Sequence, residues 1–314
     1  MRIAIFAHDA GASDLLLALQ NNFQEQYTFL NFYTPNSPFD RLLRHHNKKV
    51  LQYATLTDDL TAFQADLILI GTSWQTDIHN LFLNYAKENN IPSAAFLDHW
   101  TYYEKRFKDI FPNFILTFDT HSTQLAKKAN LPNVIEIQNY HLQALKKQYS
   151  TINKTSKKQL LFLSEPTAKV AFSRYNNTKY WGFDEIDIFK EILHFAKEND
   201  FELLVRLHPS DESRKYKKVE STFSISTNTL LEDIANSQLI IGIDTIALYY
   251  AYIFGKKVVA LMPSSNREVV VPLPQKNIKK TLQQLDIDTL QTYDTKKEKN
   301  NGLQFDTFIQ RYIV

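Results

Sequence analysis

Residues 65–71 read ADLILIG, in which the unbroken apolar run 67–70 ends in glycine, and residues 77–89 follow with apolar side chains at helical spacing. A run without alternation is typical of a strand buried on both faces. The spacing of Ile78, Leu81 and Tyr85 is typical of a helix that covers one of those faces. This strand and helix predict a parallel sheet, because parallel strands are joined by crossover segments that are usually helices.

The same alternation of apolar strands and amphipathic helices continues along the chain. Further strands are expected at residues 2–7, 27–32, 92–97, 114–118, 159–163, 202–207, 222–226, 239–243 and 257–261, and helices at 14–23, 122–130, 185–199, 229–235, 245–254 and 303–312. The polar, lysine-rich residues 148–158 (QYSTINKTSKK) separate two halves. We therefore expect an α/β protein with two tandem Rossmann-like, doubly wound domains, 1–150 and 151–314, and an interdomain cleft at the carboxyl ends of the strands.

The composition excludes several classes of protein. The chain has 314 residues, 44% of them hydrophobic, and a formal net charge of +2, which gives no argument for a nucleic-acid partner. It has only 6 glycines, and neither G-x-G-x-x-G nor G-x-x-x-x-G-K-[ST] occurs, which argues against an ordinary Rossmann dehydrogenase, P-loop NTPase or protein kinase. It has no cysteine and no H-E-x-x-H motif, so we expect neither a metal site nor a cofactor.

The sequence also indicates where the protein works. No apolar stretch approaches the ~20 residues of a membrane span, and the apolar run at the N-terminus ends at His8, too early for a signal peptide. Together with the absence of cysteine, this predicts a cytoplasmic protein. The lysines at 276, 279 and 280, and at 296, 297 and 299, suggest peripheral contact with an anionic membrane, although a solvated face is the simpler interpretation. The oligomeric state is left open.

In the first half, polar side chains follow two strands at the edge where the cleft is expected. His8 and Asp9 come after residues 2–7, and Asp98 and His99 come after residues 92–97. Either pair could take a proton from a hydroxyl group, so all four are candidate catalytic residues. Capping of the next helix by Asp9 and a backbone hydrogen bond of His8 are the structural alternatives. The sequence does not choose between the two pairs.

In the second half, the strand ends carry groups that suit phosphate. Residues 206–211 read RLHPSD, in which arginine and histidine supply hydrogen-bond donors for a diphosphate or phosphodiester. Thr245 is placed as the N-cap of a helix whose first N–H groups can bind an anion. The predicted nucleotide-contacting residues are Ser164, Glu165, Arg206, His208, Pro209, Thr245, Ser264 and Ser265.

Two of these segments resemble a known superfamily. Residues 232–261 (EDIANSQLIIGIDTIALYYAYIFGKKVVAL) resemble the donor half of GT-B glycosyltransferases. RLHPSD resembles the R-x-HP element of bacterial sialyltransferases, Kdo transferases of capsule assembly and CDP-glycerol glycerophosphotransferases. The resemblance implies His208, Thr245 and Ser264 or Ser265 as phosphate contacts. It also implies a metal-independent glycosyltransferase that moves a sugar from a nucleotide-sugar donor to a glycan acceptor of a bacterial surface, such as capsule or lipopolysaccharide, with a CMP-linked acidic sugar favoured over UDP- or CDP-linked donors.

The sequence departs from those families at two points, and alternatives remain. The helix after Thr245 lacks the glutamate that commonly binds the donor ribose, and the D/E-D/E-G motif of sialyltransferases has only a partial counterpart in Asp9-Ala10-Gly11. One alternative is a sugar-nucleotide 2-epimerase or hydrolase of the same architecture, although Ile243-Asp244-Thr245 does not supply its usual Ser-Gly-Gly turn. The other is a non-catalytic subunit that binds glycan or nucleotide.

Overall fold

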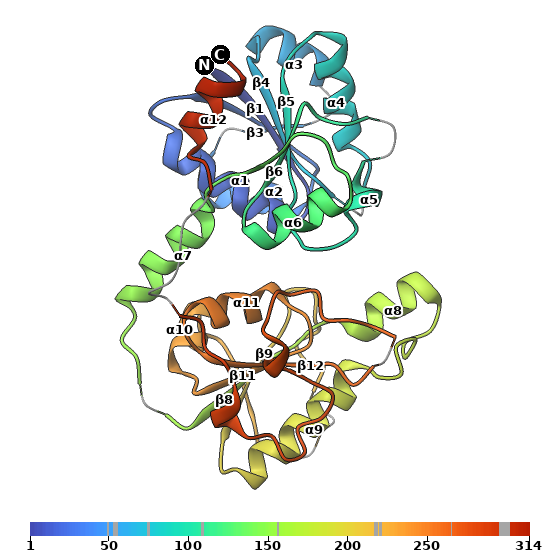
Figure 1. Ribbon diagram of the computed structural model, residues 1–314, viewed down its shortest axis with the longest axis vertical. Helices are drawn as coiled ribbons and strands as arrows, with labels where there is room; N and C mark the ends of the chain where they lie inside the picture. The colour runs from blue at the N-terminus through green and yellow to red at the C-terminus, as the bar shows by residue number, and fades with distance from the viewer. Residues whose placement is uncertain are drawn as a thin grey trace. The chain divides into compact units, whose positions relative to one another are not determined.

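The computed structural model describes residues 1–48, 50–52, 56–73, 76–107, 110–155, 157–216, 219, 222–264, 266–294 and 302–314. The chain divides into two compact units (Figure 1). The first contains Met1–Ala144 and Lys299–Val314, and the second contains Leu145–Glu298. Among the described residues, no helix is long and apolar enough to cross a membrane.

The first unit is built on a parallel sheet of seven strands in the order β3-β2-β1-β4-β5-β6-β7. The order reverses between β1 and β4, so the loops after these two strands leave the sheet in opposite directions at a topological switch point. The strands are β1 (Arg2–Ala7), β2 (Thr28–Tyr33), β3 (Val50–Gln52), β4 (Leu67–Gly71), β5 (Ser93–Phe96), β6 (Phe114–Thr117) and β7 (Val134–Glu136).

Helices cover both faces of this sheet, which explains why its strands are apolar throughout. Phe6 of β1 stacks on Phe82 of α4 on one face, with 4.5 Å between the ring centroids. On the other face, Gly71 admits α1 so closely that a Cβ there would lie 2.4 Å from the Cβ of Ala12. The helices are α1 (Ala10–Phe23), α2 (Pro38–His45), α3 (Leu56–Phe63), α4 (His79–Glu88), α5 (Tyr103–Arg106), α6 (Thr120–Lys128) and α12 (Phe305–Tyr312), while α7 (Tyr140–Thr151) begins in this unit and ends in the second.

The C-terminal helix belongs to the first unit, which corrects the predicted division at residues 150 and 151. Phe305 and Phe308 of α12 are fully buried, and the ring of Phe305 lies 5.5 Å from that of Phe23. The hydroxyl of Tyr27 donates to Asp306 at 2.7 Å. The helix was expected at residues 303–312, but its periodicity could not show against which sheet its apolar face packs.

The second unit contains a parallel sheet of six strands in the order β10-β9-β8-β11-β12-β13, which reverses between β8 and β11. The strands are β8 (Gln159–Leu163), β9 (Glu202–Arg206), β10 (Ser224–Ile225), β11 (Leu239–Gly242), β12 (Lys257–Leu261) and β13 (Ile278–Lys279). The helices are α8 (Thr167–Tyr175), α9 (Glu185–Glu198), α10 (Leu230–Asn236) and α11 (Ile246–Ile253), with short 3₁₀ turns at Gln275–Asn277 and Ile287–Thr289.

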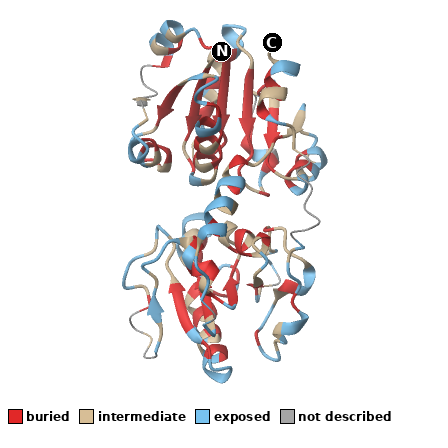
Figure 2. Ribbon diagram, turned by 90° about the vertical axis from the view of Figure 1, so that its left-hand side faces the viewer, coloured by how far each residue is buried: buried red, intermediate tan, exposed pale blue. Residues whose placement is uncertain are grey.

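Two separate cores pack on the two faces of this sheet. Most of its strand residues are buried (Figure 2). Leu160 and Phe162 of β8 pack with α9, while Leu161 and Leu163 pack with α10 and α11. Successive residues of a strand point to opposite faces, so each face needs its own apolar cover. Both units are therefore doubly wound Rossmann-like domains, and the predicted fold class is confirmed.

Candidate functional site

Asp9 lies at the switch point of the first unit, where β1 and β4 end side by side. Its carboxylate accepts a hydrogen bond from the hydroxyl of Ser73, 2.8 Å away, at the end of β4. Asp9 precedes α1 but makes no capping bond to that helix with its side chain, so the capping alternative is wrong. The carboxylate is instead held at the carboxyl edge of the sheet.

Asp98 lies at the same edge but is more firmly bound. One of its oxygens pairs with Arg106 of α5, and both side chains are almost completely buried. Arg106 also donates to the hydroxyl of Thr72 at 2.6 Å. The other Asp98 oxygen lies against the first turn of α1, where a Cβ on Gly11 would approach it to 2.9 Å. Because Asp98 is paired with a buried cation, it fits a positioning role better than that of a proton acceptor.

Two imidazoles accompany these carboxylates. Burial lowers the pKa of His99, although the charge of Asp98 opposes this effect, so the ring carries no proton charge near neutral pH. The Nδ1 atoms of His8 and His99 are both buried and have no hydrogen-bond partner within the described parts of the chain. The structure thus brings all four predicted catalytic residues to one edge of one sheet.

Asp14 of α1 is a candidate that sequence reasoning missed. Burial raises its pKa to about 6, which is well suited to proton transfer near neutral pH. It is half-buried and stands three residues after Gly11, so the two share a helix face. The available signal was a single acid inside the otherwise apolar run SDLLLAL, which we interpreted only as part of a helix.

In the second unit, Glu165 and Asp244 meet at the switch point between β8 and β11. Glu165 accepts the backbone N–H of Asp244 at 2.6 Å. Asp244 accepts the N–H groups of Val270 and Val271 at 2.8 and 3.0 Å. The two carboxylates therefore connect three strand-end loops. The evident role of Glu165 is to hold these loops together, rather than the predicted contact with a nucleotide.

Arg267 balances these two carboxylates. Its guanidinium lies 3.9 Å from Glu165 and 3.6 Å from Asp244, and it packs 4.6 Å above the ring of Trp181. Burial nevertheless raises the pKa of Glu165 to about 7 and also raises that of Asp244. Both ion pairs are long, and Arg267 remains partly exposed, so its charge is available to an anion at this edge.

His208 is prepared to donate a hydrogen bond through Nε2. Its Nδ1 accepts the backbone N–H of Ser210 at 3.1 Å and lies 2.7 Å from the hydroxyl of the same residue. The proton of the neutral ring is therefore on Nε2. Burial lowers the pKa of His208, and the charges of Lys215 and Lys169 contribute to the decrease. Lys169 of α8, which the sequence analysis missed, thus places a cation near this donor.

The remaining predicted contacts divide into two groups. Thr245 is the N-cap of α11 as predicted, and its hydroxyl accepts the N–H of Ala247 at 3.4 Å. Ser264 accepts the N–H of Asn266 at 3.0 Å, Pro209 is exposed beside His208, and Ser265 lies outside the described residues.

Ser164 and Arg206 are held in networks that need no ligand. The buried hydroxyl of Ser164 lies 2.6 Å from Asp211 and 2.7 Å from the hydroxyl of Tyr216. Arg206 pairs with the fully buried Asp233 at 2.8 Å and directs its guanidinium toward α10. The RLHPSD motif therefore combines one structural arginine with one available histidine, which spacing alone did not distinguish.

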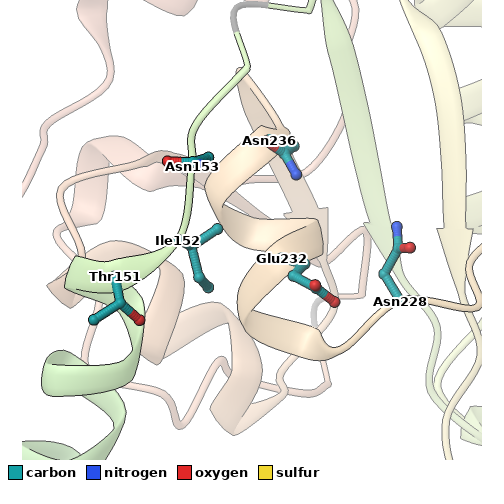
Figure 3. A pocket seen from close by; sticks show the side chains of 6 residues that line it. All are labelled: Thr151, Ile152, Asn153, Asn228, Glu232 and Asn236. Carbon is teal, nitrogen blue, oxygen red and sulfur yellow. The ribbon is translucent and has the colours of Figure 1, made fainter.

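A polar pocket of about 410 Å³ lies elsewhere in the second unit, beside α10 (Figure 3). Its lining contains none of the predicted site residues: Thr151, Ile152, Asn153, Asn228, Glu232 and Asn236. Glu232 already accepts the backbone N–H of Thr229 at 2.8 Å as part of a capping box. Across the described part of the chain, no group of three or more His, Asp or Glu residues could hold a metal ion.

No protein-family model and no curated protein sequence matches this chain. Solved structures do match it in fold. The UDP-N-acetylglucosamine 2-epimerase from Rickettsia bellii has a TM-score of 0.64 at 12% identity, and the match covers 96% of this chain and 89% of the other. The chain has a GT-B fold.

Two further solved structures share this fold. The glycosyltransferase SnogD from Streptomyces nogalater has a TM-score of 0.57 at 10% identity, covering 92% of this chain and 90% of that one. HepE of Anabaena, solved in complex with UDP, has a TM-score of 0.52 at 13% identity, covering 83% and 80%. At these identities the similarity establishes the GT-B fold and no specific activity.

Proposed function

We propose that the protein is a glycosyltransferase that uses a nucleotide sugar as donor. The observation that carries the proposal is the different chemistry of the two switch points. The first unit has carboxylates and buried imidazole nitrogens at its edge, and the second has His208, Lys169, Arg267 and the N-terminus of α11. The former suit removal of a proton from an acceptor hydroxyl, and the latter suit a diphosphate or phosphodiester leaving group.

On the donor side, negative charge develops on the leaving phosphate as the glycosidic bond breaks. The Nε2–H of His208, the ammonium of Lys169 and the first N–H groups of α11 are proposed to stabilise that charge. Arg267 would move from its two distant carboxylates to the phosphate. With this many donors and cations, we propose that transfer needs no metal ion.

On the acceptor side, Asp9 is the proposed base, because its carboxylate lies at the switch point beside the hydroxyl of Ser73, whereas the carboxylate of Asp98 is paired with the buried Arg106. The ion pair between Asp98 and Arg106 would hold the edge of the sheet in position. Asp9→Asn should lower kcat by about a hundredfold or more, as loss of a general base commonly does, and leave nucleotide binding unchanged. If Asp14→Asn has that effect and Asp9→Asn does not, the base is Asp14.

The donor and acceptor classes are narrower parts of the proposal. The RLHPSD resemblance favours a CMP-linked acidic sugar and a bacterial surface glycan, while the UDP in HepE supports a UDP-linked donor. The reaction would take place in the cytoplasm. Thermal unfolding of the full chain with CMP, UDP, TDP and GDP decides among the nucleotides, since a ligand at a hundred times its Kd stabilises the folded state by about 2.7 kcal/mol.

A matched pair of variants tests the donor site. His208→Ala should abolish most of the nucleotide-induced stabilisation. His194→Ala, on the exposed side of α9 in the same unit, should leave it unchanged. If no nucleotide stabilises the wild type, or if both variants respond as the wild type does, the proposed donor site at His208 is refuted.

The second candidate function is a sugar-nucleotide 2-epimerase, which the match to the Rickettsia enzyme over 96% of this chain favours. Incubation of UDP-N-acetylglucosamine with the protein, without any acceptor, separates the two. An epimerised sugar nucleotide identifies an epimerase, and free UDP identifies a hydrolase. A product that forms only with an added acceptor identifies a glycosyltransferase, and binding without turnover identifies a non-catalytic subunit.

A further inference from the structure

Exposed aromatic side chains are concentrated in one short segment of the second unit, α8 and the turn that follows it. Phe172, Tyr175 and Tyr180 are 53%, 42% and 47% exposed. They make up three of the nine large hydrophobic side chains that are exposed in the described parts of the chain. Singly exposed apolar side chains are common, but a cluster of them indicates an interaction surface.

Two of the three rings stack on each other, and the third shares a face of α8 with one of them. Phe172 and Tyr175 are three residues apart on α8 and share a face of the helix. Asn176 then adopts a left-handed conformation with φ of 53°, which turns the chain back on itself. As a result, Tyr180 stacks on Tyr175 with 3.7 Å between the ring centroids. We call Phe172, Tyr175 and Tyr180 the aromatic tip.

The tip is not needed for the core of the unit. Helix α8 buries only Thr167 and Ala171, and it lies at the periphery of the second unit, away from the sheet (Figure 1). Trp181 connects the tip to the body: it lies edge-on to Tyr175 and Tyr180 and stacks with Arg267. The tip therefore combines exposed rings with a firm attachment.

The segment that carries the tip has charges of one sign only. Residues 166–183 contain Lys169, Arg174 and Lys179 but no aspartate or glutamate. Lys179 is paired with Asp187 at 2.6 Å, which fixes the return of the chain. Lys169 and Arg174 are exposed. Aromatic rings next to exposed cations are the side chains that bind at the interface of an anionic bilayer.

We propose that the aromatic tip docks on the surface of an anionic lipid bilayer. The rings enter the headgroup region, and Arg174 contacts the lipid phosphates. Because α8 follows the carboxyl end of β8, docking would bring the switch-point edge of the second unit toward the membrane. This surface differs from the lysine runs that the sequence analysis considered, of which residues 296, 297 and 299 lie outside the described residues.

Sedimentation of the full chain with vesicles tests the proposal. We expect binding to vesicles of phosphatidylglycerol and phosphatidylcholine, much weaker binding to phosphatidylcholine alone, and weakening by salt. The double variant Phe172→Ser, Tyr175→Ser and the single variant Arg174→Glu should each raise the Kd about tenfold or more. Leu81→Ser, which removes a side chain that is 48% exposed on α4, is the matched control and should bind as the wild type does.

A spectroscopic probe shows whether the tip itself enters the membrane. In the Phe172→Trp variant, the emission of the new tryptophan should shift to the blue on anionic vesicles. The proposal is overturned if the wild type does not bind anionic vesicles, if the tip variants bind as well as the control, or if the emission stays unchanged. Binding to a soluble anionic polysaccharide but not to vesicles would identify a glycan surface instead.

The outcomes separate this proposal from the proposed function. If the protein binds vesicles through the tip but transfers no sugar, the membrane surface is supported and the proposed transferase activity is refuted. If the protein transfers sugars but does not bind vesicles, the transferase is supported and the membrane surface is refuted.

Discussion

Glu165→Gln should make the second unit more stable at high pH and leave it nearly unchanged at low pH. Burial raises the pKa of Glu165 from 4.5 to about 7. A difference of roughly 2.5 pKa units, at 1.36 kcal/mol each, corresponds to about 3 kcal/mol of unfolding free energy. The side chain is 12% exposed, so solvent screening reduces this value little.

The sign of the effect follows from proton binding. The folded state holds the Glu165 proton more tightly than the unfolded chain does, so this group favours folding fully below pH 4.5. Its contribution is lost as the pH rises to about 7, and the deprotonated carboxylate remains a cost above that. Glutamine resembles the protonated acid and can still accept the N–H of Asp244, so the variant should avoid the loss.

The measurement is urea unfolding at a series of pH values, with pulsed hydrogen exchange on peptides from β8 and β11. Exchange is chosen because two units need not unfold in one transition, and these peptides report on the second unit alone. Glu198→Gln is the control, since Glu198 is exposed on α9. The reasoning fails if the stability difference between Glu165→Gln and the wild type is the same at pH 5 and pH 8, or if the variant is less stable at pH 8.

Two predictions concern the first unit. Asp98→Asn should destabilise it by about 3–5 kcal/mol, because the buried charge of Arg106 is left without its partner, and Asp98→Asn combined with Arg106→Met should recover much of that loss in urea unfolding. If the single and double variants are equally unstable, the ion pair is not the cause. Gly71→Ala should cost about 1–3 kcal/mol, because the added Cβ meets Ala12 at 2.4 Å, and calorimetry that shows an unchanged Tm would contradict that contact.

Much of the fold could be predicted from the sequence because burial on both faces produces continuous apolar strands. The predicted bounds of β8 and β12, residues 159–163 and 257–261, are those that the structure shows. Helix α1 begins at Ala10, earlier than the predicted residue 14, because residues 10–13 (AGAS) also adopt helical turns. Helix α8 was not predicted, since it buries only two residues and shows little periodicity.

The location of the candidate site could also be predicted, because the ends of parallel strands meet at one edge whatever the side chains are. The role of each side chain could not. Asp9 and Asp98 look equivalent in the sequence, and only the packing of α5 gives Asp98 a buried arginine. Arg206 and His208 are two residues apart, yet one pairs with Asp233 and the other keeps a donor available.

The sequence by itself determined two doubly wound sheets and the strand ends at which chemistry is concentrated, because these depend on the local pattern of apolar and polar residues. The tertiary structure decided which carboxylates are paired, which pKa values burial shifts, and to which unit α12 belongs. Those properties depend on neighbours that are distant in sequence. The pKa of Glu165, for example, is raised by burial and lowered in part by Arg267 and the backbone of Asp244, residues that reach it only through folding.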